Sequence, residues 1–201
     1  RDFSGQAFLL EPTGLSVVSD IDDTIKITEV LDKKRLLRRT FTMPFEAVAG
    51  MTTLYRDLAA AGASFHYVSG SPWHLYPELS AFFAQVGFPA GTFHLREFRA
   101  KDKRRFNLLE KVAPFKRAQI SALMQRFPQR KFILIGDTGE QDPEVYGEMA
   151  RQFPNQVQRI VLRRVPGDTW TDARRNKALA NVTAPIIEFT AAPSSTAVLA
   201  P

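Results

Sequence analysis

The chain has 201 residues, of which 44% are hydrophobic and 24% charged, and it carries a formal net charge of +6. This length and composition fit one domain with its own core, and the basic balance suits polyanions such as nucleic acid, anionic lipid or a phosphorylated substrate. The chain has no cysteine and no apolar run long enough to cross a bilayer, which excludes disulfides, thiolate metal sites and membrane-spanning helices within it.

Apolar runs predict strands that alternate with helices along the chain. The predicted strands cover residues 15–21, 63–70, 91–98, 131–137, 156–165 and 185–189. The predicted helices cover residues 44–62, 74–88, 114–128 and 142–154, the last with Asp142 as its N-cap. Such alternation indicates βαβ units and therefore an α/β fold, with a doubly wound, mostly parallel sheet and helices on both faces.

We expect a single domain over residues 1–201, with small insertions at about 25–43 and 99–113. Residues 190–201 are low in charge and rich in Ala, Ser and Thr, which predicts a flexible tail. Insertions of this size form only a minimal cap, and an open crevice fits a substrate held in a membrane or on a macromolecule. Because the chain opens on "RDFSG" without an initiator Met, we expect it to be a fragment of a longer chain.

Polar side chains follow three of the predicted strands, at residues 20–22, 69–71 and 136–138. Ligands of open α/β sheets bind beyond the carboxyl ends of the strands, so neighbouring strands would bring these residues to one crevice. Carboxylates at the end of a buried strand cost free energy unless they are paired, hydrated or metal-bound. A solvated turn is the alternative reading of Asp20 and Asp22 when that motif is taken alone.

The residue types at these strand ends allow phosphoryl-transfer chemistry. One ionised aspartate can act as a nucleophile, and a second can serve as general acid and then as general base. The stretch "GDTGEQD" adds the carboxylates of Asp137, Glu140 and Asp142, which are ligands of the kind that Mg²⁺ prefers. Lys116, near the start of a predicted helix, is a candidate for the positive charge beside a phosphate.

"DIDDT" at residues 20–24 is the DxDxT signature of haloacid-dehalogenase-superfamily phosphatases, and Ser69, Lys116 and the pair Asp137 and Asp142 match the second, third and fourth motifs of that superfamily in order. The stretches "SDIDDTIK", "SGSPWHLYPEL", "LREF" and "GDTGEQDPEVYGEMARQFP" resemble the actin-patch-associated phosphatidate phosphatase family, over about residues 14–165. The match departs from that family at Phe115, where a His is expected before Lys116.

The resemblance implies a role for each matching residue. Asp20 would attack the phosphorus and form an aspartyl-phosphate, and Asp22 would protonate the leaving alkoxide and then activate water. Thr24 would fix the loop. Ser69 and the amide of Gly70 would bind phosphate oxygens, and Lys116 would balance charge between Asp20 and the phosphate.

The resemblance also implies the cofactor and the reaction. Mg²⁺ would take the Asp20 carboxylate, the main-chain carbonyl of Asp22 and Asp137, with Asp142 bound directly or one shell further out. The implied reaction converts phosphatidate to diacylglycerol and inorganic phosphate. A cytoplasmic or peripheral-membrane location is slightly favoured, but the sequence predicts neither the compartment nor the oligomeric state.

Further candidates lie around this core of motifs. Lys26 and Arg96 are expected to contact substrate, and the exposed face of Trp73 and Tyr76 could meet an acyl chain or a lipid interface. The basic residues of the stretch "LREFRAKDKRR" (95–105) could contact an anionic membrane, or could simply form a solvated face. Asp23 is expected to be solvated or to cap a turn.

Two other functions remain compatible with the sequence. One is a phosphomonoesterase for another bulky substrate, such as a phosphoprotein or a nucleic-acid end, although nucleic acid is not the partner we expect. The other is a phosphatase-like lipid-binding module without turnover, against which the intact pair of Asp20 and Asp22 argues. The "DTG" at 137–139 also occurs in aspartic proteases, but here it follows a parallel-type strand and has no second copy.

Overall fold

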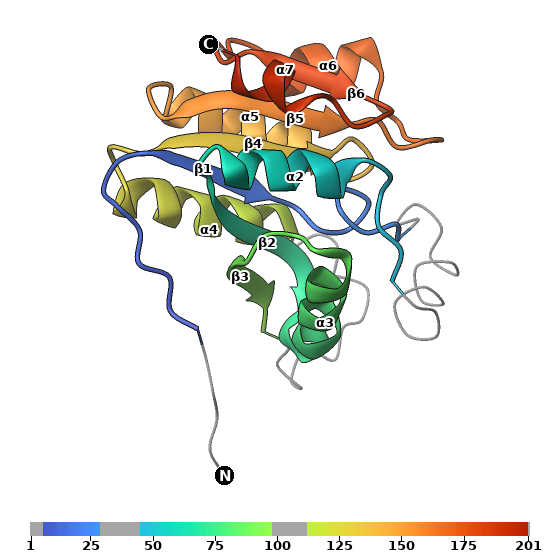
Figure 1. The fold of residues 1–201 in the computed structure, drawn as a ribbon. Helices are drawn as coiled ribbons and strands as arrows, with labels where there is room; N and C mark the ends of the chain where they lie inside the picture. Colours follow the sequence, from blue (N-terminus) through green and yellow to red (C-terminus); the bar gives the residue numbers. More distant parts are fainter. Residues whose placement is uncertain (1–5, 29–44, 98–111, 201) are drawn as a thin grey trace.

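The computed structural model describes residues 6–28, 45–97 and 112–200, and these form a six-stranded, all-parallel sheet with helices on both faces (Figure 1). The strand order is β3-β2-β1-β4-β5-β6, which confirms the predicted α/β class. The strands are β1 (Leu15–Ser19), β2 (Ser64–Pro72), β3 (Gly91–Arg96), β4 (Lys131–Asp137), β5 (Val157–Arg163) and β6 (Ile186–Phe189).

The helices bury a separate core on each face of the sheet. One core lies under α2 (Met51–Ala60), α3 (Tyr76–Val86) and α7 (Ser195–Leu199). The other lies under α4 (Val112–Arg126), α5 (Asp142–Gln152) and α6 (Asp172–Ala178). Neighbouring residues of the central strands alternate between them, since Val17 and Ile133 belong to the first core and Val18 and Leu134 to the second. Among the described residues, no helix is long and apolar enough to cross a bilayer.

The sheet reverses its direction of growth at β1. Strands β2 and β3 extend it on one side of β1, whereas β4, β5 and β6 extend it on the other. Ser19, the last residue of β1, is in register with Tyr67 of β2 and with Ile135 of β4. The carboxyl ends of β1, β2 and β4 therefore meet at the switch point, where open α/β sheets bind their ligands.

The prediction that a helix begins at residue 44 is wrong, because α2 begins at Met51. Gly50 precedes it with φ of 79°, a conformation that favours glycine. Residues 45–48 instead pair with the loop after β1: the Ile27 amide donates to the Glu46 carbonyl, and the Val48 amide donates to the Ile25 carbonyl, both at 2.8 Å. This tertiary pairing, which local sequence does not reveal, outweighs the helical spacing.

Asp142 is the first residue of α5 and does not cap it, contrary to the prediction. Gln141 stands at the N-cap position, and no side chain caps this helix. The Asp142 carboxylate is engaged in the crevice instead, as described below. In addition, the short helix α6 was not predicted; Thr171 caps it by accepting a hydrogen bond from the Arg174 amide at 3.2 Å.

The expected flexible tail contains α7, whose Val198 is fully buried in the first core. Ser195 donates to the Asp57 carboxylate at 2.8 Å, and Arg159 donates to the Ala200 carbonyl at 2.6 Å. Residues 195–200 are therefore docked on the domain. Of the expected insertions, residues 29–43 and 99–111 lie outside the described residues, as does most of the basic stretch 95–105.

Candidate active site

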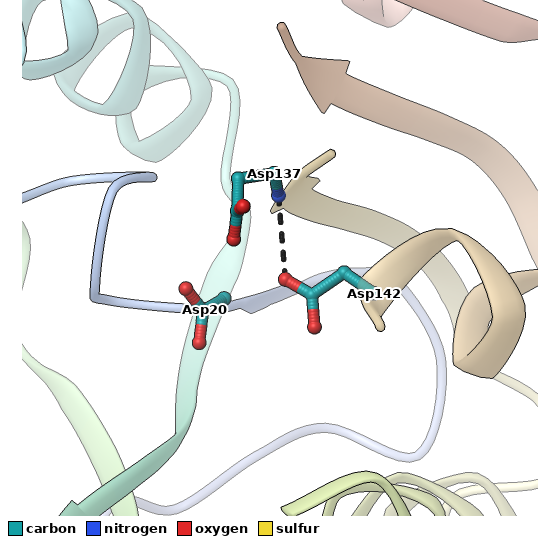
Figure 2. Close-up of side chains that lie close together, drawn as sticks. All are labelled: Asp20, Asp137 and Asp142. Carbon is teal, nitrogen blue, oxygen red and sulfur yellow. Dashed lines mark hydrogen bonds between the residues drawn. The ribbon is translucent and has the colours of Figure 1, made fainter. Parts of the chain in front are cut away.

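Three buried carboxylates meet at the switch point, as Figure 2 shows. Asp20 follows β1, Asp137 ends β4 and Asp142 begins α5. Each offers an oxygen atom within 4.8 Å of the others. The Asp137 amide also donates to the Asp142 carboxylate at 3.3 Å, which fixes the start of α5 against the end of β4.

Gly136 makes this close approach possible. A Cβ atom at position 136 would overlap the carboxylate of Asp142 and would lie only 2.6 Å from Cε2 of Tyr146. Tyr146 in turn donates from its hydroxyl to the Ile135 carbonyl at 2.9 Å. The glycine before Asp137 therefore serves to bring α5, and Asp142 with it, onto the end of β4.

The three carboxylates fit a bound cation. Within the described residues, the buried Oδ2 atoms of Asp20 and Asp137 have no hydrogen-bond partner. The other oxygen of Asp137 accepts from the amides of Gly139, at 2.6 Å, and Glu140, at 3.0 Å. Buried carboxylate oxygens without donors are costly unless a cation neutralises them, and a hard divalent cation takes such oxygens as ligands.

Lys116 supplies a positive charge from α4, and its side chain is only 2% exposed. Its Nζ atom lies 2.7 Å from Asp20, 2.5 Å from Asp142 and 3.5 Å from Glu140. Burial disfavours the ammonium form, but the carboxylates of Asp142, Asp20 and Glu140 outweigh it and hold the pKa of Lys116 well above its ordinary value. Lys116 is therefore charged and bridges the acids.

Asp20 and Asp137 bind protons more tightly than in water when the site holds no metal. Burial raises the pKa of Asp20 well above its ordinary value, Lys116 only partly offsets this, and the nearby Asp142 carboxylate adds to it. Burial, together with the charges of Asp142 and Asp20, likewise raises the pKa of Asp137. A divalent cation at these oxygens would favour their ionised forms.

Asp22 lies beside this cluster in a different environment. Its Oδ1 accepts from Lys26 and from the Thr28 hydroxyl, both at 2.8 Å, and its Oδ2 accepts from the hydroxyls of Ser71, at 2.7 Å, and Ser69, at 3.2 Å. Burial opposes ionisation, but the charge of Lys26 and these hydrogen bonds hold the pKa of Asp22 well below its ordinary value. The surroundings of Asp20 and Asp22 therefore shift the pKa values of these two carboxyls in opposite directions.

The expected contact of Lys26 with substrate stays a prediction, and in this structure its ammonium is paired with Asp22. Lys26 is buried between the Asp22 carboxylate and the Phe45 ring, whose centroid lies 4.5 Å from Nζ. Asp23 is not solvated but caps a turn: it is buried, has φ of 55°, and accepts from the Thr28 amide at 2.8 Å. Lys26 therefore holds the Asp22 carboxylate, and Asp23 holds the loop that carries it.

The end of β2 brings Ser69, Gly70 and Ser71 to the same crevice. The Ser69 hydroxyl accepts from the Ser71 amide at 2.9 Å, and both hydroxyls face Asp22. A Cβ atom on Gly70 would lie 2.9 Å from the side chain of Val112, so α4 packs directly on this end of β2. The Thr24 hydroxyl is buried and has no hydrogen-bond partner within the described residues, so its expected role in fixing the loop has no visible contact.

Trp73 and Arg96 lie at the edge of the crevice rather than in the acidic cluster. Arg96, the last residue of β3, is in register with Pro72, which directly follows Ser71. Trp73 is 43% exposed and its ring centroid lies 5.7 Å from that of Tyr76, which is 40% exposed. Trp73 also borders a cavity of about 470 Å³ that Phe115, the neighbour of Lys116, lines as well.

Several residues that hold the site were not predicted to do so. Ser71 was expected at the crevice as part of the 69–71 strand end but was given no role, whereas Thr28 offered no motif. Arg174 lies far along the chain on a helix that was not predicted, and it donates to the Thr138 carbonyl at 2.8 Å. Side-chain direction across elements is not encoded in any of these patterns.

Glu140 predicts a pH effect on stability in the metal-free protein. Burial raises its pKa to about 6, so its neutral form stabilises the fold below the unfolded pKa of roughly 4.5, and this contribution is lost as pH rises through about 6. We therefore expect the free energy of unfolding of Glu140→Gln, measured with urea in EDTA, to rise relative to that of the wild type by up to roughly 2 kcal/mol between pH 4.5 and 7.5.

Two histidines have the opposite effect on stability, and comparing the variant with the wild type cancels their contribution. Burial lowers the pKa of His66 and of His94, which makes stability rise with pH over part of the same range. Both residues are present in the wild type and in Glu140→Gln, so their contribution cancels. An identical pH dependence of the two proteins would contradict the prediction.

The chain thus combines a parallel α/β sheet with an aspartate-rich site at the ends of its central strands. The family model "Phosphatidate phosphatase APP1, catalytic domain" matches residues 15–164. The chain therefore belongs to the family of the APP1 phosphatidate phosphatase catalytic domain, which confirms the resemblance seen in the sequence.

Two curated fungal relatives are each 34% identical to the chain. "Uncharacterized protein C29B5.04c" of Schizosaccharomyces pombe aligns over 172 residues, 84% of this chain and 28% of the relative. "Phosphatidate phosphatase APP1" of Saccharomyces cerevisiae aligns over 159 residues, 77% of this chain and 26% of the relative. The chain thus spans about a quarter of the length of these relatives.

A solved structure shares the fold. A chain in "Structure of Pnkp1/Rnl/Hen1 complex" superposes with a TM-score of 0.50 and 16% sequence identity, over 69% of this chain and 42% of that chain. At this identity the likeness concerns the fold alone.

Proposed function

We propose that the protein is a Mg²⁺-dependent phosphatidate phosphatase that works through an aspartyl-phosphate. The observation that carries the proposal is the buried cluster at the switch point, in which Asp20 and Asp137 each have one oxygen without a hydrogen-bond partner among the described residues, and in which Asp20 pairs with the charged Lys116. Membership in the APP1 catalytic-domain family supports phosphatidate as the substrate.

Asp20 and Asp22 divide the chemistry. Asp20 attacks the phosphorus, so that an O–P bond to its carboxylate forms while the ester O–P bond breaks. Asp22 gives its proton to the departing alkoxide of diacylglycerol. Asp22 then takes a proton from water, whose oxygen displaces Asp20 from phosphorus and releases inorganic phosphate, so that Asp20 is again a carboxylate and Asp22 again carries its proton.

Asp22 must carry a proton before the first step, although Lys26 and three hydroxyls favour its anion. A bound phosphate favours protonation of Asp22. Its negative charge raises the pKa of that carboxyl, and a monoanionic phosphate ester brings a proton of its own. The hydroxyls of Ser69 and Ser71 can then turn from Asp22 to the phosphate oxygens. Substrate binding and protonation of Asp22 are coupled in this scheme.

The remaining residues bind and orient the phosphate. Ser69, the Gly70 amide and Lys116 would hold its oxygens, and Lys116 would keep Asp20 ionised next to an anion. Mg²⁺, held by Asp20, Asp137, the Asp22 carbonyl and Asp142 either directly or one shell out, would neutralise the negative charge of the acids and the phosphate. Arg96, near Ser71, would meet the rest of the polar head of the substrate.

The apolar part of the substrate would lie against the aromatic pair of Trp73 and Tyr76. This pair follows Ser69 and Ser71 closely in sequence. Exposed aromatic side chains suit the boundary between a polar site and lipid. Trp73 also borders the cavity that Phe115 of α4 lines, which offers further apolar surface beside this pair.

Phosphate release tests the function. We expect the protein to release phosphate from phosphatidate in mixed micelles with Mg²⁺ and to lose this activity in EDTA. Turnover of p-nitrophenyl phosphate alone would favour another bulky phosphomonoester as substrate. Binding of phosphatidate vesicles without turnover of either compound would favour a lipid-binding module.

Replacing Trp73 by Ala should impair lipid turnover selectively. Loss of a large exposed apolar contact is expected to raise KM for phosphatidate in micelles roughly tenfold, while KM for p-nitrophenyl phosphate stays unchanged. Leu9→Ala is the matched control, because Leu9 is fully exposed and lines neither of the cavities that Trp73 borders. Equal changes on both substrates would argue that Trp73 supports the fold rather than lipid binding.

A further inference from the structure

Arg174 on α6 connects two parts of the acidic cluster's scaffold. Its Nη1 donates to the Thr138 carbonyl at 2.8 Å and its Nη2 donates to the Glu140 carbonyl. The same guanidinium forms a two-pronged ion pair with Glu144 in the first turn of α5, at 2.7 and 3.0 Å. Arg174 lies beyond residue 164, where the family match ends.

The loop that Arg174 contacts is the one that orients Asp137. The Thr138 carbonyl and the Gly139 amide belong to one planar peptide unit. Arg174 binds the carbonyl side of this unit, and Asp137 accepts from its amide side at 2.6 Å. The orientation of this peptide therefore depends on both partners, and it leaves the second oxygen of Asp137 without a donor among the described residues.

Neighbouring contacts hold Arg174 itself in place. Thr171 caps α6, and the guanidinium lies 5.2 Å from the centre of the Trp170 ring. The Thr138 hydroxyl donates to Asp168, which accepts from the Trp170 amide at 3.0 Å. A Cβ atom on Gly147 would overlap the Ala178 carbonyl, so α6 packs on α5 at a distance that only glycine allows.

We infer that Arg174 is a positioning residue for the metal site. It fixes the 138–140 loop against the start of α5, and so it fixes the spacing of Asp137, which the loop holds, from Asp142, which begins α5. Both acids would change position if the loop and helix separated. This inference rests on the proposed Mg²⁺ site, and residues that orient metal ligands typically affect metal affinity 10- to 100-fold.

Mg²⁺ binding to the whole chain tests the inference by titration calorimetry. Arg174→Met should weaken the Mg²⁺ Kd at least tenfold. The matched control is Arg175→Met, which removes a neighbouring arginine from the same helix and breaks its ion pair with Glu188. That control should leave the Mg²⁺ Kd within twofold, even if both variants lower Tm equally in EDTA.

A second variant keeps the test decisive if Arg174→Met fails to fold. Arg174→Lys retains the charge but cannot reach the loop and both oxygens of Glu144 together, so we expect it to weaken Mg²⁺ binding as well. A Mg²⁺ Kd within twofold of the wild-type value in a folded Arg174 variant would overturn the inference about Arg174 but not the proposed metal site. Failure of the wild type to bind Mg²⁺ would instead overturn the proposed metal site, and the inference with it.

Discussion

Replacing Asp20 by Asn should lower phosphate release by at least roughly 10³-fold, because a carboxamide cannot form the aspartyl-phosphate. The loss should fall on kcat for both phosphatidate and p-nitrophenyl phosphate, since every substrate must pass through the same attack. The fold should survive. Asp20 is a buried acid whose raised pKa marks its charge as costly, so a neutral isostere removes a strained charge.

The best control for this change lies three residues further on. Asp23→Asn makes the same substitution in the same loop, and asparagine tolerates the positive φ and can still accept from the Thr28 amide. We expect its activity to stay within about threefold of the wild type. Turnover by Asp20→Asn at the wild-type rate would refute Asp20 as the nucleophile.

Replacing Lys116 by Met should unfold the protein more readily as well as inactivate it. Its ammonium neutralises carboxylates that are themselves buried, so its removal should cost about 3–5 kcal/mol in the free energy of unfolding at pH 7.5 in EDTA. The penalty should shrink at pH 5, where the buried Asp20 can take up a proton in place of its lost partner. Urea unfolding at both pH values measures the difference.

Arg117→Met provides the comparison, because Arg117 is the next residue of α4 and pairs with Glu148 at 2.9 Å on the surface. Exposed pairs of this kind contribute about 0–1 kcal/mol. A similar loss of stability in both variants would show that the cluster around Lys116 does not depend on its charge.

Continuous apolar runs allowed most of the sheet to be predicted. The run at 131–137 gave β4 with the bounds found in the structure, because a strand buried on both faces has little choice of element. The start of α2 was wrong because residues 45–48 pair with a loop distant in sequence. Helix α6 was missed because it is short and packs through contacts made by Arg174, which no local pattern reveals.

Among the residues of the site, some could be predicted from local patterns and others depend on tertiary contacts. Asp20, Asp137 and Asp142 could be predicted to meet because strand ends converge in a parallel sheet, and the order of motifs added Lys116. The partners of Asp22 could not be predicted, since Lys26 and Thr28 reach it through a turn that depends on the positive φ of Asp23. Sequence patterns locate backbone ends, whereas the direction of each side chain depends on tertiary packing.

The strand order also bears on how the molecule opens in its native state. Strands β1 and β4 have a hydrogen-bonded neighbour on each side, whereas β3 is an edge strand. Amides of central strands typically exchange with solvent only through global unfolding, and edge elements open locally. We therefore expect the cluster of Asp20, Asp137 and Asp142 to lie on the most slowly exchanging part of the sheet, and the Trp73 face, beside β3, to open more readily.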